Sequence, residues 1–70
     1  MKRADAAKAL ADEALLVLRA EYRNLLVTPL AADRPQRDVI REKFNAGLRI
    51  NLEALAVGLK AVAENPDLED

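Results

Sequence analysis

Residues 40–62, IREKFNAGLRINLEALAVGLKAV, decide the fold because their apolar side chains recur every three or four positions. This spacing predicts a helix that carries two adjacent apolar stripes. The first stripe is Ile40, Phe44, Gly47, Asn51, Ala54, Gly58 and Ala61, and the second is Leu48, Leu52, Leu55, Leu59 and Val62. With their apolar neighbours the stripes span roughly 240° of the helix, so this helix needs at least two neighbouring helices.

The predicted helix extends from about residue 34 to residue 64. Asp33 and Gln36 fit a capping box at its start, and Asn65-Pro66 ends it. Alanine and leucine dominate residues 2–27, which predict a first helix ended by Pro29. That helix carries a heptad stripe of Ala11, Leu15, Leu18, Tyr22 and Leu25. Because the connection is only about six residues long, we expect an all-α antiparallel two-helix hairpin over residues 1–64.

A chain of 70 residues lies near the lower size limit for independent folding and needs an additional source of stability. The sequence has no cysteine and no histidine, which excludes disulfides and Cys/His zinc sites. Oligomerisation remains as the additional source of stability, and we expect two hairpins to form a four-helix bundle. The first stripe contains small residues that permit close backbone approach, so we expect it to form the dimer seam, with Asn51 fixing the register.

Catalytic groups are scarce, since the chain also lacks serine and any glycine-rich phosphate loop. We therefore expect a protein that is not an enzyme and that uses no cofactor, metal ion or small molecule. No apolar run is long enough to cross a bilayer, and residues 1–5 do not begin a signal peptide. These features predict a cytoplasmic location without membrane attachment.

Charge is unevenly distributed around a formal net charge of −1. Residues 19–49 carry an excess of +3, whereas residues 53–70 carry an excess of −4. We expect the acidic tail, residues 65–70, to be disordered. A candidate basic patch at the loop end consists of Arg19, Arg23, Arg34, Arg37 and Arg41. Ordinary surface pairing is the alternative interpretation, since Arg34 and Asp38 are four residues apart.

Leu16 points away from the heptad stripe of the first helix, into a face that also holds Asp5, Asp12, Arg19 and Arg23. A single exposed leucine is normal on a protein surface. A leucine ringed by charges on a long helix is also how a binding hot spot is built. Leu16 and the five arginines are therefore the candidate partner-binding residues.

The heptad stripes and the short connection resemble the Rop family, the small helical-hairpin dimers of mobile elements that form antiparallel four-helix bundles and bind paired RNA loops. The Rop-like RNA-binding face is polar, basic and aromatic, whereas the corresponding face here alternates acids and bases without an aromatic residue. The chain also resembles small helical phage proteins that disable host regulators, including anti-activators of transcription. That resemblance implies a homodimer that inhibits a host protein by direct binding. The alternatives are a Rop-like RNA- or DNA-binding regulator and a structural bundle within a larger assembly.

Overall fold

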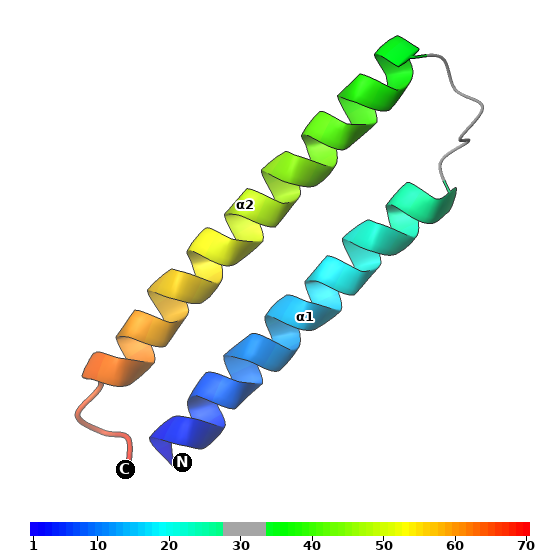
Figure 1. The fold of residues 1–70 in the computed structure, drawn as a ribbon. Coiled ribbons are helices and arrows are strands. Elements are labelled where there is room, and N and C mark those ends of the chain that lie inside the picture. Colours follow the sequence, from blue (N-terminus) through cyan, green and yellow to red (C-terminus); the bar gives the residue numbers. More distant parts are fainter. Residues whose placement is uncertain (28–33) are drawn as a thin grey trace.

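The computed structural model describes residues 1–27 and 34–70, which form two antiparallel helices lying side by side (Figure 1). Helix α1 spans Arg3–Val27 and helix α2 spans Arg34–Glu64, against predicted ranges of about 2–27 and 34–64. The described residues form no β-strand, so the all-α class and the hairpin are confirmed. The predicted roles of Pro29 and Asp33 at the helix ends lie outside the described residues.

Helix α2 ends where Pro66 interrupts the chain. The amide of Asn65 donates a hydrogen bond to the carbonyl of Val62 (3.4 Å), which tightens the last turn. The Oδ1 atom of Asn65 then accepts a hydrogen bond from the amide of Asp67 (2.8 Å). An asparagine that bonds to the backbone two residues further on forms a local turn. This turn sends the tail back towards the start of α1.

The hairpin is a single layer of two helices. Its Cα atoms extend over 52 × 16 × 9 Å, and no described side chain is fully buried. Each helix covers only one stripe of its neighbour, so the best-protected side chains are half-buried. Domains normally enclose a core between two packed layers, whereas the described hairpin is a single layer.

The contact between the helices uses a stripe of α1 that differs from the heptad stripe described in the sequence. The half-buried residues of α1 that recur at heptad spacing are Ala7, Leu10, Ala14, Leu18, Glu21 and Leu25. Of the predicted stripe, only Leu18 and Leu25 belong to this set, whereas Ala11, Leu15 and Tyr22 are exposed. α1 is therefore rotated so that its small residues Ala7 and Ala14 face α2.

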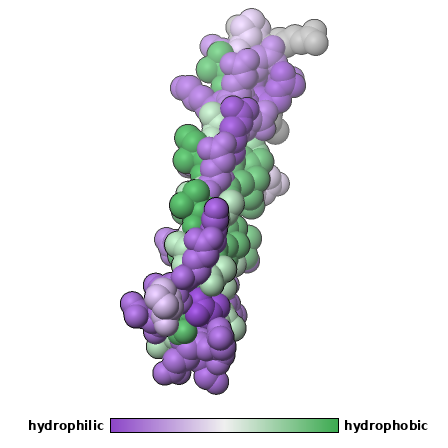
Figure 2. Space-filling model, turned by 90° about the vertical axis from the view of Figure 1, so that its left-hand side faces the viewer, coloured by the Kyte–Doolittle hydropathy of each residue, from purple (hydrophilic) through white to green (hydrophobic). Residues whose placement is uncertain are grey.

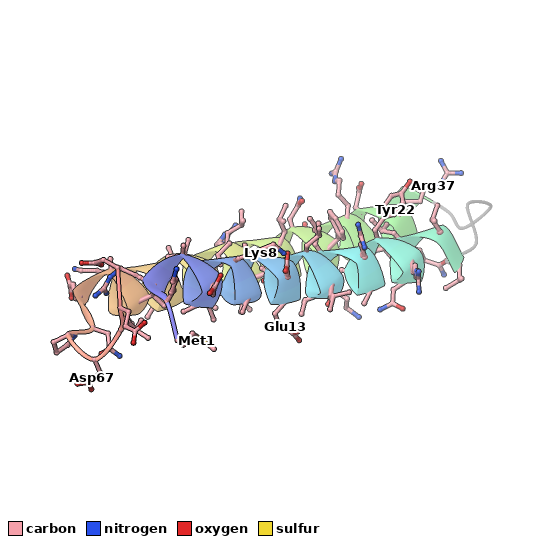
Figure 3. All side chains as sticks on the ribbon, turned by 90° about the horizontal axis from the view of Figure 1, so that it is seen from below. Met1, Lys8, Glu13, Tyr22, Arg37 and Asp67 are labelled. Atoms are coloured by element: carbon pink, nitrogen blue, oxygen red, sulfur yellow. The ribbon has the colours of Figure 1, made fainter. Side chains whose placement is uncertain are left out.

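The acidic tail, which we expected to be disordered, lies against the start of α1 in the structure. The amide of Arg3 donates to the carbonyl of Glu69 (2.6 Å), and the amide of Glu69 donates to the carbonyl of Met1 (3.3 Å). Leu68 is half-buried in this arrangement. Figure 3 shows Met1 and Asp67 at the same end of the hairpin.

The Arg3 guanidinium connects the two ends of the chain. It donates hydrogen bonds to the carbonyls of Val62, Ala63 (3.2 Å) and Leu68 (3.0 Å), and its Nε atom lies 2.8 Å from the Asp70 carboxylate. The last carbonyls of a helix lack intrahelical partners and carry partial negative charge. The last turn of α2 has no basic residue of its own, so Arg3 supplies the compensating charge from α1.

We predict that Arg3→Ala lowers the free energy of unfolding by about 1.5–3 kcal/mol, the usual range for hydrogen bonds to a charged group. Thermal unfolding followed by circular dichroism at fixed chain concentration measures this loss. Amide exchange at Glu69 should also accelerate, because the tail loses its anchor. Lys8→Ala is the matched control: it removes a cation from α1 that makes only an exposed pair with Asp12, and it should change little. Equal effects of the two substitutions would contradict the capping role of Arg3.

Candidate interaction surfaces

The predicted dimer seam is largely occupied within one chain. An added Cβ atom at Gly58 would lie 3.0 Å from Cδ1 of Leu10, and one at Gly47 would lie 3.6 Å from the Glu21 carboxylate. Both glycines therefore allow α1 to approach α2 closely within one chain. Ile40 and Phe44 of the same stripe are half-buried, whereas its members Ala54 and Ala61 are exposed. This placement assigns most of the first stripe to the contact between α1 and α2, and its role as a seam between two copies stays a prediction.

Asn51 also faces α1. Its Nδ2 atom donates a hydrogen bond to the carbonyl of Ala14 (3.0 Å), and its side chain is half-buried. A polar group at a helix contact is costly unless it has a partner, and a single asparagine at such a position can fix the register. Asn51 therefore specifies the alignment of the two helices near the middle of the hairpin.

We predict that Gly47→Ala stabilises the hairpin more than Gly58→Ala does. Each substitution gains up to about 1 kcal/mol of helix propensity. At position 47 the new methyl group makes ordinary contact with a flexible carboxylate, whereas at position 58 the Leu10 side chain must move to admit it. Thermal unfolding at one chain concentration compares the two variants. Equal stabilisation would mean that the Leu10 contact does not limit the approach of the helices.

One broad face of the hairpin is rich in leucine. It presents the exposed side chains of Leu15, Tyr22, Leu52 and Leu59, which we call the leucine face. Residues Ala4, Leu15 and Tyr22 recur on one side of α1, and Leu52 and Leu59 recur on one side of α2. A shallow groove lined by Ala4, Ala7, Leu59 and Val62 shows that these two sides are adjacent.

The opposite broad face carries the exposed β-branched side chains Val17, Val39, Ile50 and Val57, which we call the β-branched face. A second groove, which joins Asn24 of α1 to Ile40 and Lys43 of α2, shows that both helices contribute to it. Figure 2, which looks onto α2, shows a polar strip with apolar side chains on both sides. In Figure 3, Tyr22 and Glu13 lie on opposite sides of α1.

Leu16 is 56% exposed on the outward face of α1, close to the exposed Arg19 and Arg23. Arg37 is exposed at the loop end of α2 (Figure 3). Arg41 donates a hydrogen bond to the Asp38 carboxylate on the same helix (3.3 Å). The side chain of Arg34 lies outside the described part of the structure. The arginines thus share one end of the hairpin but are divided between two helices.

The Lys8 ammonium donates a hydrogen bond to the Asp12 carboxylate one turn away (2.7 Å). This hydrogen bond, together with the attraction between the two charges, raises the pKa of Lys8. The pair lies on the outward side of α1, at the edge of the leucine face, and Lys8 remains charged at neutral pH.

The two exposed apolar faces are the features that sequence reasoning did not assign to binding. Leu52 and Leu59 were in the second predicted stripe, and Leu15 and Tyr22 were in the predicted stripe of the first helix. The signal was the width of the apolar arc, which exceeds what one neighbouring helix can cover. Periodicity did not indicate which apolar stripe of each helix forms the contact between α1 and α2.

Comparisons with protein-family models, curated proteins and solved structures found no match to this chain. Among the described residues, no group of three or more acidic side chains is placed to hold a metal ion. Neither α1 nor α2, as described, is apolar enough over a sufficient length to cross a bilayer.

Proposed function

We propose that this chain is a non-enzymatic regulator that self-associates into a four-helix bundle and acts by binding another protein. The observation that carries the proposal is a hairpin with no buried side chain among its described residues and with an apolar surface on both broad faces. Exposed apolar surface of this extent is typical of protein interaction sites. The best-fitting role is an inhibitor that covers a functional surface of a host protein, such as a transcription regulator.

The outward face of α1 supports a binding site for such a partner. It combines one large apolar side chain, Leu16, with the exposed cations Arg19 and Arg23. Binding hot spots characteristically have an apolar anchor and arginine side chains within a ring of polar groups. The α1 helix also presents these residues on a rigid scaffold.

A Rop-like regulator that binds RNA or DNA is the second candidate. It is favoured by the positive half of the hairpin, where residues 19–49 carry seven bases and four acids. Phosphate binding of this kind releases counterions and weakens steeply as salt is raised. An apolar protein interface is much less sensitive to salt, so salt dependence separates the two candidates.

We predict that Leu16→Glu abolishes capture of a host protein while leaving self-association intact. The tagged chain is incubated with lysate of its host, with and without nuclease, and bound proteins are identified by mass spectrometry at low and high salt. Ala56→Glu, which adds the same charge to the exposed outward side of α2, is the control and should bind as the native chain does.

A bound protein that survives nuclease and high salt, and is lost only in Leu16→Glu, agrees with the proposal. Capture that disappears with nuclease favours the nucleic-acid candidate. Recovery of the bait alone favours a structural bundle within a larger assembly. Equal capture by Leu16→Glu and the native chain would remove the outward face of α1 from the proposed site.

A further inference from the structure

We infer that a second copy of this chain covers the leucine face, with its long axis antiparallel to the first copy. The inference rests on the self-association proposed above and specifies its surface and symmetry. The two-fold axis lies in the plane of the interface, at right angles to the long axis of the hairpin, and passes near mid-length, beside Leu15 and Leu52. Three observations support this arrangement: the area left exposed, the charges on each face and the charge distribution along the hairpin.

The exposed area matches what a stable dimer buries. The chain exposes 5731 Å² at a mass of 7.7 kDa. A compact monomer of that mass exposes about 4,300 Å², which leaves an excess of roughly 1,400 Å² per chain. The broad face measures 52 by 16 Å between Cα atoms, and a standard interface buries about 800 Å² per partner. One covered face therefore accounts for much of the excess.

The charges distinguish the two broad faces. On the β-branched face, Glu13 lies near mid-length, one residue from the Ala14 contact. A two-fold axis there would bring two Glu13 carboxylates together and remove them from water, which is unfavourable. The middle of the leucine face presents Leu15 and Leu52, flanked by half-buried leucines of both helices. The same symmetry on that face brings only apolar side chains together.

Charge along the hairpin sets the direction. The loop half, residues 19–49, has a formal charge of +3, whereas residues 1–18 and 50–70 together have four bases and eight acids, or −4. An antiparallel two-fold places the positive half of each copy over the negative half of the other. Packed layers lie about 10 Å apart, within the distance over which charges interact at moderate salt. A parallel arrangement would oppose like charges at both ends.

Two matched substitutions on α2 test the face. Leu52 is 55% exposed on the leucine face, and Val57 is 71% exposed on the β-branched face. Sedimentation equilibrium should give twice 7.7 kDa for the native chain and for Val57→Lys, but 7.7 kDa for Leu52→Lys at the same concentration. The measured mass reports association whether or not the separated chain stays helical.

The opposite pattern, with Val57→Lys monomeric and Leu52→Lys dimeric, would overturn the assignment of the face and leave self-association standing. Dimers in both variants would also exclude the leucine face. A native chain that stays monomeric across the micromolar range would overturn self-association itself.

A spin label tests the direction separately. The chain has no cysteine, so Val27→Cys, at an 80% exposed position outside the leucine face, takes a single label. Position 27 is 12 residues from Leu15, beside which the two-fold axis lies, so an antiparallel dimer separates the two labels by about 36 Å along the hairpin. A parallel dimer would hold them within roughly 25 Å, since neighbouring helix axes lie 8–10 Å apart. Double electron–electron resonance gives the distance, and the shorter value would overturn the antiparallel arrangement.

Discussion

Two helices form one layer, and one layer cannot enclose a core. That constraint underlies every other feature of this chain, because each helix can cover only a single stripe of its neighbour. The described residues accordingly include none that is fully buried, although half of the sequence is apolar. The remaining apolar surface is divided between two broad faces. The way in which this exposed apolar surface is covered, and not the contact between α1 and α2 alone, determines the stability of the folded chain.

Polar contacts compensate for the lack of specificity in the apolar contact. Heptad stripes permit a helix to slide by seven residues and meet an equivalent set of apolar side chains. The hydrogen bond from Asn51 to Ala14 and the bonds from Arg3 to the end of α2 oppose such a slip at two separate levels. The Asn51 bond acts near the middle of the hairpin and the Arg3 bonds act at its open end, and both specify the same register of the two helices.

Periodicity predicted the helices and the hairpin, because spacing of three and four residues is a local property of the sequence. It did not predict which stripe each helix uses. An arc of roughly 240° on α2 admits several rotations of α1, and local pattern does not rank them. Small residues such as Ala14 lie at the contact, whereas the larger Leu15 and Tyr22 remain exposed. The anchoring of the tail was missed for a different reason: Arg3 and Leu68 are 65 residues apart, and only the folded hairpin brings them together.

Folding and association are coupled in a chain of this kind. A partner that binds only the folded hairpin stabilises it by mass action, so apparent stability rises with the concentration of the partner. If a second copy covers the leucine face, the outward face of α1 and the β-branched face remain on the surface of the bundle. The dimer would then still present Leu16 twice, once on each α1. Two identical sites on one rigid body favour a partner that is itself two-fold symmetric, because binding at the first site raises the effective concentration at the second.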